Sequence, residues 1–274
     1  MDVVHGIDAL RTAHGRLFVV IGVFDGLHVG HRYLLEHLVL EAARRSARPA
    51  VITFDHHPDE VLTGAAPPLL MDPADRLELL AAAGVEVTIV QHFDDALRTT
   101  PYDAFVARIR ARIELAGFLM TPDAAFGFER RGTPDLVSSL GKTRGFDVVV
   151  VAPFDLDGHP VRSTAIRAAI AEGDLGAASR LLGRNVGLRA TVIGAESDGA
   201  AALGFPLPVA LPPDGSYACV VGGRPGTLRV RGGGASLAPA PDGAQVAIEL
   251  VHPSAQALSD VEHDPGKPAT IRRS

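Results

Sequence analysis

The feature that most constrains the fold is a change of hydrophobic period along this 274-residue chain. Between Phe18 and about Gly183, apolar runs typical of buried strands alternate with segments whose apolar residues recur every three or four positions. Strands that alternate with helices predict a parallel sheet covered on both faces. From Asn185 to Val251 the helical period is absent, and short strand-like runs lie between Gly, Pro and Asp-Gly turns. This second texture predicts a small antiparallel domain or barrel.

The fold class expected from these two textures is α/β, with two domains in sequence order. We place a parallel-sheet domain over residues 1–184 and a β domain over 185–251. The remaining segment, 252–274, is polar and contains prolines, which predicts a weakly ordered tail.

Individual elements follow from local signals. One helix is marked by Asp72 as N-cap, Pro73 at the first helical position and Gly84 past its end. The other expected helices are 31–45, 101–117, 163–174 and 174–183, and the expected strands are 17–24, 49–54, 85–90, 145–154, 188–195, 215–221, 227–232 and 244–251.

Charge and cysteine content exclude several classes of protein. The formal charge is −6 with no block of Lys or Arg, which argues against a nucleic-acid partner but leaves a small anionic ligand possible. Cys219 is the only cysteine, which excludes an intrachain disulfide and a Cys-based zinc site and fits a reducing compartment. No signal-peptide pattern and no run long enough to span a bilayer is present. We therefore expect a cytoplasmic protein without a membrane partner, and the oligomeric state stays open.

The stretch "FVVIGVFDGLHVGHRYLL" places His28 and His31 where a strand gives way to a helix. Three interpretations are open: two histidines whose hydrogen bonds are satisfied within a turn, a metal-binding pair, or a phosphate-binding pair. The metal interpretation has no acidic or thiol partner at a typical offset. The phosphate interpretation fits the context, because ligands of parallel sheets bind beyond the strands' carboxyl ends, where helix N-termini attract anions. Gly26 and Gly30 would let the backbone approach such a ligand.

Several motifs in order carry a family resemblance. The decapeptide "GVFDGLHVGH" resembles the signature of HxGH nucleotidylyltransferases, and the chain more narrowly resembles bacterial bifunctional riboflavin kinase/FAD synthetases. "TFDHHPDEVL" resembles that family's Phe-x-Pro-His-Pro segment, with His56 where the family has Pro. "DAAFGFERRG" resembles its Phe-Gly-x-x-Arg-x-Gly loop, "VRSTAIR…LLGR" its Ser-Ser-Thr-x-Ile-Arg helix start, and "LGFPLPVALPPDGSYA" the opening of its kinase domain.

The resemblance implies a Rossmann-like nucleotidylyltransferase domain that converts ATP and FMN to FAD and pyrophosphate, with Mg²⁺ entering on the nucleotide and no metal held by protein ligands. In-line attack without a covalent enzyme intermediate is expected. It implies catalytic roles for His28, His31 and Arg167. The implied ATP-binding residues are Gly22, Val23, Phe24, Asp25, Gly30, His31, Ser163, Thr164 and Arg167, and the implied flavin-binding residues are Phe54, His57, Pro58, Asp123, Phe126 and Arg130.

Two of these positions have simpler alternatives. Ser163, taken alone, is best interpreted as a plain helix N-cap. The alternative for Phe54 is core packing. Two whole-protein alternatives also stay open: a nucleotidylyltransferase with another phosphate-bearing acceptor, and a non-catalytic nucleotide or flavin sensor.

The β domain departs from the family's kinase pattern. Where the kinase carries Pro-Thr-Ala-Asn, this chain reads Pro206, Leu207, Pro208 and Val209, with no hydroxyl or amide side chain for Mg-ATP. The family's catalytic Glu falls near Glu249. We therefore expect a degenerate kinase-like domain that no longer phosphorylates riboflavin.

Overall fold

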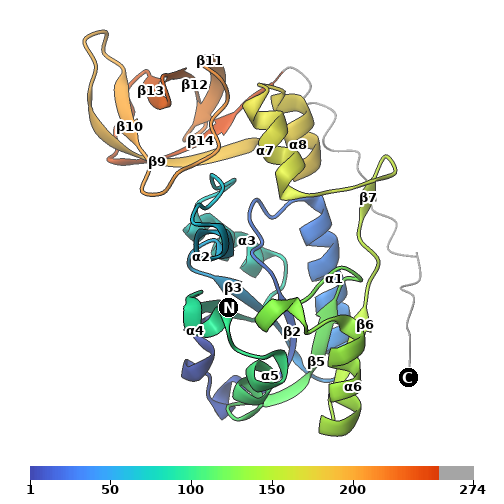
Figure 1. Cartoon of the computed structure of the whole chain (residues 1–274). Coiled ribbons are helices and arrows are strands. Elements are labelled where there is room, and N and C mark those ends of the chain that lie inside the picture. Colours follow the sequence, from blue (N-terminus) through green and yellow to red (C-terminus); the bar gives the residue numbers. More distant parts are fainter. Residues whose placement is uncertain (253–274) are drawn as a thin grey trace.

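The computed structural model describes residues 1–252, so the prediction of a weakly ordered tail lies, except for His252, outside the described residues. The described chain has two parts, a parallel sheet with its helices and a β-barrel, and the barrel lies above the sheet in the view of Figure 1. Among the described residues, no helix is long and apolar enough to cross a bilayer.

The sheet has six strands in the order β1-β4-β3-β2-β5-β6, and every neighbouring pair is parallel. The expected α/β class with a parallel sheet is therefore confirmed. The strands are β1 (Asp2–His5), β2 (Arg16–Ile21), β3 (Arg48–Phe54), β4 (Val87–Gln91), β5 (Glu114–Met120) and β6 (Asp147–Val150).

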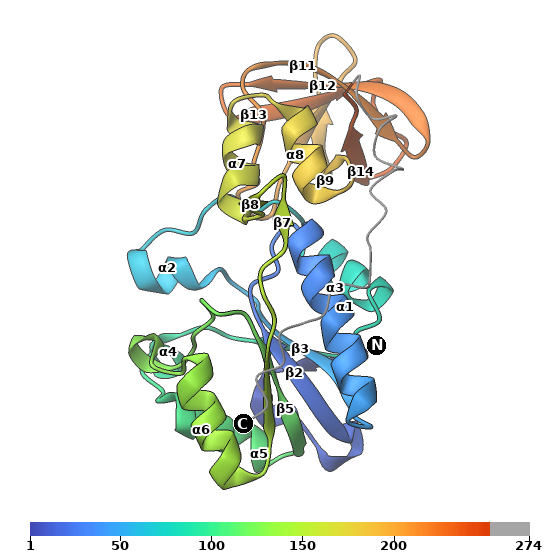
Figure 2. The same cartoon turned by 90° about the vertical axis from the view of Figure 1, so that its right-hand side faces the viewer.

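Helices cover both faces of this sheet, as Figures 1 and 2 show. Alternate β2 residues point to opposite faces: Phe18 packs in one core cluster with Leu35 of α1, and Val19 packs in another with Phe105 of α5. The helices of this part are α1 (Val29–Arg44), α2 (Pro58–Thr63), α3 (Pro73–Ala82), α4 (Asp95–Arg98), α5 (Tyr102–Arg110) and α6 (Pro134–Arg144), with 3₁₀ turns at Ile7–Ala9, Thr12–His14 and Phe128–Arg130.

The second part is a closed antiparallel barrel with strand order β10-β13-β12-β11-β14-β9, which confirms the barrel-like prediction. A small hairpin, β7 (Asp155–Leu156) and β8 (His159–Pro160), and two helices, α7 (Ser163–Ala171) and α8 (Leu175–Leu182), precede it. The barrel strands are β9 (Val186–Ala195), β10 (Ala201–Gly204), β11 (Gly215–Val221), β12 (Arg224–Arg231), β13 (Gly234–Ala238) and β14 (Gln245–Leu250).

Helices α7 and α8 share the hydrophobic core of the barrel. Ile166, Ile170 and Leu182 belong to the same buried cluster as Leu188 and Leu250 of the barrel strands. Figure 1 shows both helices beside the barrel. The apolar side of α7 is therefore covered by the barrel rather than by the two clusters that flank the sheet.

Polar contacts also join the two parts. The backbone of Leu69, in the loop before α3, accepts a hydrogen bond from the Ala210 N–H at 2.9 Å and donates one to the Pro208 carbonyl at 2.8 Å. Arg189 of β9 forms an ion pair with Asp75 of α3. These bonds fix the loop before α3 against the barrel.

The helix predicted over 101–117 is wrong in its second half. Helix α5 ends at Arg110, and β5 begins at Glu114 and lies between β2 and β6. Six of the seven β5 residues are buried, because a central strand of a covered parallel sheet is apolar on both faces and so shows no alternation. Gly117 fits the same location, since a Cβ there would stand 2.3 Å from the Asp147 carbonyl oxygen. Strands β1, β7, β8, β10 and β13 and helices α2, α4 and α6 were not predicted from the sequence.

Candidate functional site

A cavity of about 450 Å³ opens at the carboxyl ends of β2, β5 and β6. The first turns of α1 and α7 both line it, so two helix N-termini, with their unpaired N–H groups and positive dipole ends, face one space. Its volume is in the range of small-molecule sites. The cavity therefore has the placement and the polarity of an anion-binding site.

His28 is the N-cap of α1 and is 4% exposed. Its Nδ1 accepts a hydrogen bond from the backbone N–H of His31 at 3.2 Å. The neutral imidazole of His28 must then carry its proton on Nε2, where it can donate to a ligand oxygen. The turn-histidine interpretation thus accounts for one nitrogen of His28 and leaves the other for binding.

His31 stacks on His28 with ring centroids 3.6 Å apart and planes at 15°. Its Nδ1 is shielded from solvent and has no hydrogen-bond partner within residues 1–252. A buried polar atom without a partner costs stability, and such atoms in a cavity wall are candidates for ligand contacts. Hydrogen bonds within the turn therefore do not satisfy both rings, and the phosphate-binding interpretation of the pair stays a prediction.

Burial lowers the pKa of His28 to about 4, and the nearby charge of Arg184 acts in the same direction. The pKa of His31 is also lowered well below its ordinary value, first by burial and then by His28 and Arg184. Both rings are therefore neutral at pH 7 without a ligand. An arriving phosphate would favour the protonated form, so charge on the imidazoles can develop with the charge on the ligand.

The turn between β2 and α1 is held by Asp25, which is 3% exposed. Its carboxylate accepts hydrogen bonds from the Leu70 N–H at 3.0 and 3.1 Å and forms a 2.5 Å ion pair with Arg167. Phe24 and Leu27 on either side have positive φ values of 55° and 38°, which are rare for such residues. Asp25 thus lines the cavity and also ties this strained turn to α7 and to the loop before α3.

Helix α7 contributes the second half of the polar wall. Its N-cap is Arg162, and the Ser163 hydroxyl donates to the Asp25 carbonyl at 3.0 Å. The alternative of Ser163 as a plain N-cap is therefore wrong, because its side chain bonds across to the β2–α1 turn. Arg167 donates from Nε to the Pro68 carbonyl at 2.8 Å as well as pairing with Asp25. Its guanidinium lines the cavity but is already held by protein oxygens.

The residues expected on the flavin side divide into two groups. His57 lines the cavity as the N-cap of α2, with its Nδ1 accepting from the Asp59 N–H at 3.2 Å, and Asp123 lines it while accepting from the Thr121 hydroxyl. Phe54 packs edge-on to Phe93, as its core alternative predicts.

Three further flavin-side residues lie outside the cavity lining. Phe126 packs against Phe118, and exposed Arg130 donates to the Asp123 carbonyl at 3.2 Å, while Pro58 only begins α2. The predicted site residues that line the cavity are Gly22, Val23, Phe24, Asp25, His28, Gly30, His31, His57, Asp123, Ser163, Thr164 and Arg167.

Four polar residues that line the cavity, Tyr33, Asp59, Thr121 and Arg162, were not predicted, and neither was Arg184, which contacts the turn before α1. Thr121 follows β5 directly, and the assignment of that segment to a helix hid its place at a strand's carboxyl end. Arg162 lines the cavity. Its position immediately before the predicted start of the helix at Ser163 could have identified it as a site residue. Arg184 donates to the carbonyls of Gly26 at 2.6 Å and Leu27 at 3.2 Å, so it braces the turn before α1.

Comparison with known proteins is consistent with this geometry. Residues 10–165 match the FAD synthetase family. A bifunctional riboflavin kinase/FMN adenylyltransferase from Haemophilus influenzae is 34% identical over 209 residues, covering 75% of this chain and 67% of the relative. Proteins of the same description from Pseudomonas fluorescens and Escherichia coli are each 32% identical, over 67% and 75% of this chain and 60% and 66% of their own lengths. The chain thus spans about two thirds of these relatives.

The fold also resembles that of a solved structure. The crystal structure of a macrolide-efflux protein from Streptococcus pneumoniae matches with a TM-score of 0.77 and 22% identity, over 91% of this chain and 90% of that one. At that identity the match shows a shared fold, which includes the barrel. It carries no information about activity.

Proposed function

Because the chain belongs to the FAD synthetase family, we propose that it transfers the adenylyl group of ATP to FMN, giving FAD and pyrophosphate. The observation that carries this proposal is the cavity in which stacked His28 and His31 at the start of α1 face the start of α7. Two converging helix N-termini suit a polyphosphate, and neutral imidazoles suit a charge that grows during reaction.

In this reaction an oxygen of the FMN phosphate attacks the α-phosphorus of ATP, and the bond to the bridging oxygen of the departing pyrophosphate breaks. His28 donates from Nε2 to a phosphate oxygen, while its Nδ1 stays fixed by the His31 N–H. His31, whose ring is stacked on that of His28, binds the phosphates together with it. The enzyme's contribution is to align the two phosphates and to stabilise the charge that shifts to pyrophosphate.

The adenosine and triphosphate would lie against the β2–α1 turn and α7. Gly22, Val23 and Phe24 form the turn, and Thr164 presents a hydroxyl beside the α7 amides. Arg167 is a positioning residue in this arrangement, because its guanidinium is bound to Asp25 and Pro68. Asp123 and His57 stand across the cavity on the proposed flavin side.

Mg²⁺ fits this site as a companion of the nucleotide. The Asp25 carboxylate is buried and bound to Leu70 and Arg167, whereas the side chains of Asp59 and Asp123, which also line the cavity, are 47% and 65% exposed and so accessible to a cation. A hard cation prefers phosphate oxygens and water together with one or two carboxylates. When bound, Mg²⁺ would neutralise part of the triphosphate charge.

We further propose that the barrel does not phosphorylate riboflavin. The segment that replaces the kinase motif contains two prolines, and its Pro208 carbonyl and Ala210 N–H are bonded to Leu69. Glu249 lies on the exposed side of β14. We keep the domain boundary at 184 because α7 lines the cavity, although α7 and α8 share the hydrophobic core of the barrel. We also keep the cytoplasm as the compartment, which free, buried Cys219 supports.

The test uses the purified chain with ATP and Mg²⁺ and either FMN or riboflavin, with flavin products resolved by chromatography. FAD from FMN, and neither FMN nor FAD from riboflavin, is the expected result. ATP binding without pyrophosphate release would favour a sensor, and faster turnover with another phosphate monoester would favour a different acceptor. FMN formed from riboflavin at about 1 per second or more would show an active kinase.

A further inference from the structure

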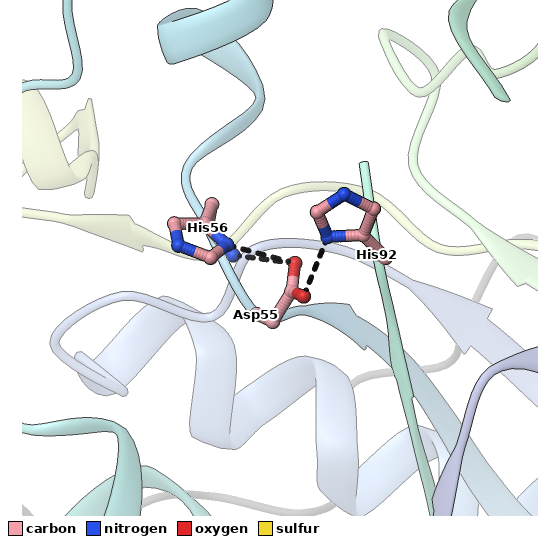
Figure 3. Close-up of side chains that lie close together, drawn as sticks. All are labelled: Asp55, His56 and His92. Atoms are coloured by element: carbon pink, nitrogen blue, oxygen red, sulfur yellow. Dashed lines mark hydrogen bonds and ion pairs between the residues drawn. The ribbon is translucent and has the colours of Figure 1, made fainter. Parts of the chain in front are cut away.

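A second group of chemically active side chains lies along the same edge of the sheet, outside the cavity lining. It consists of Asp55, His56 and His92, which Figure 3 shows gathered around the Asp55 carboxylate. Asp55 Oδ2 lies 2.7 Å from Nδ1 of His92, and Oδ1 lies 3.3 Å from Nδ1 of His56. One potential ligand atom from each residue lies within 4.8 Å of those of the other two.

We propose that Asp55, His56 and His92 form a binding site for one divalent transition-metal ion of the Zn²⁺ type. The site is separate from the proposed adenylyl-transfer centre, and none of its three residues lines that cavity. It is a proposal about metal binding, and it does not depend on the proposed activity.

The donor set selects the class of ion. Two imidazole nitrogens and one carboxylate oxygen suit zinc and its first-row neighbours, whereas Mg²⁺ and Ca²⁺ prefer oxygen ligands throughout. With metal–ligand bonds of about 2.0–2.1 Å, the ligand atoms of a tetrahedral zinc site lie about 3.3 Å apart. One ligand atom from each residue already lies within 4.8 Å of the other two, so side-chain rotations would close the three ligands on one ion.

The backbone places these ligands before any ion arrives. Asp55 directly follows β3, and His92 directly follows β4, which is the next strand in the sheet. Phe54 is paired with Gln91, and the Asp55 N–H donates to the Gln91 carbonyl at 3.3 Å. Register between paired strands therefore fixes the distance between Asp55 and His92, which lowers the entropic cost of binding.

A plain surface ion pair would explain less of this arrangement. It would account for the bond between Asp55 and His92, and such exposed pairs contribute little stability. It leaves out His56, whose backbone N–H donates to the other carboxylate oxygen at 2.8 Å and whose Nδ1 lies 3.3 Å from the same atom. Because the side chains of His56 and His92 are 48% and 62% exposed, an ion could reach them and keep water on its open positions.

The direct test is titration of the untagged, metal-free full chain with Zn²⁺ by calorimetry, and with Co²⁺ as a spectroscopic probe. We expect one ion per chain and at least about tenfold weaker binding in His56→Ala, His92→Ala and Asp55→Asn. His159→Ala, which removes an exposed histidine elsewhere, is the matched control and should bind as the unaltered chain does. Circular dichroism would confirm that each variant is folded.

Two results would overturn the proposal: no saturable Zn²⁺ binding, or equal affinity in the unaltered chain and in a variant that carries all three substitutions. The second result would place the ion at other histidines. Because the readout is metal affinity and not FAD formation, a failure here leaves the adenylyl-transfer proposal standing, and the converse also holds.

Discussion

The β2–α1 turn and the segment Phe205–Ala210 are both anchored to the loop before α3, yet they differ sharply in what they present. The turn holds Asp25 and His28 in the interior and forces Phe24 and Leu27 to positive φ. The barrel segment presents prolines and apolar side chains, and its backbone is bonded to Leu69.

The two regions differ in how many destabilising features they contain. Buried imidazoles with lowered pKa values and strained backbone reduce stability, and they cluster at sites where chemistry requires them. The barrel segment carries none of these costs among the residues described there. We infer that a catalytic function maintains the destabilising features of the turn, and that no such function acts on the barrel segment.

The largest effect is expected from substitutions of the histidines in the β2–α1 turn. His28→Ala or His31→Ala should lower kcat for FAD formation about 10²–10³-fold, the typical cost of losing a preorganised donor to a developing charge. Steady-state kinetics with FMN and ATP measure this, and circular dichroism checks the fold. Near-normal turnover in both variants would contradict the proposed roles of the histidines.

A smaller effect concerns the tie between the turn and α7. Arg167→Ala leaves the buried Asp25 carboxylate without its cation and should lower the free energy of unfolding by about 3 kcal/mol. The same variant should raise KM for ATP more than KM for FMN, because the turn and α7 face the proposed nucleotide side. Urea unfolding and steady-state kinetics test the two parts, and a rise confined to FMN would reassign Arg167 to the flavin side.

The pH dependence of stability should reveal the buried imidazole. The pKa of His28 is about 4 in the folded chain and about 6.5 when unfolded, so below pH 6.5 the unfolded chain binds the extra proton. The free energy of unfolding should therefore fall by up to about 3 kcal/mol as pH drops from 6.5 to 4. His28→Gln should show a flatter profile by urea unfolding; parallel profiles would mean that His28 titrates normally.

The smallest effect is expected from a substitution in the barrel. Glu249→Gln should change the rate of FAD formation by less than about twofold, because Glu249 is exposed on β14 and is not among the residues that line the cavity. A loss of rate comparable with that of the histidine variants would show that the barrel takes part in the chemistry.

The sequence predicted best what local signals determine. Asp72 caps α3 by accepting from the Ala74 N–H, Pro73 opens it, and Gly84 follows its end at φ 85°, as expected. Strand β11 was predicted with its observed bounds. The junction between a strand and a helix before α1 was likewise predictable, and the phosphate-binding interpretation of its two histidines stays a prediction.

What the sequence did not reveal depends on contacts between distant segments. Strand β5 has no alternation because both of its faces are buried, and only its neighbours make it a strand. Ser163 looks like a cap until its bond to Asp25, 138 positions away, is known. Arg184 braces the Gly26 carbonyl from 158 positions away, and Phe126 packs inward where its motif predicted a ligand contact.

The core shared by α7 and the barrel has a consequence for how this chain could evolve. Deleting the barrel would uncover Ile166 and Ile170, the apolar side of the helix that carries Ser163, Thr164 and Arg167. A gene truncated after α8 would therefore encode a chain in which the helix lining the proposed site has lost its support. Natural selection on FAD synthesis alone would then preserve the barrel as a scaffold, long after any selection on its own catalysis had ended.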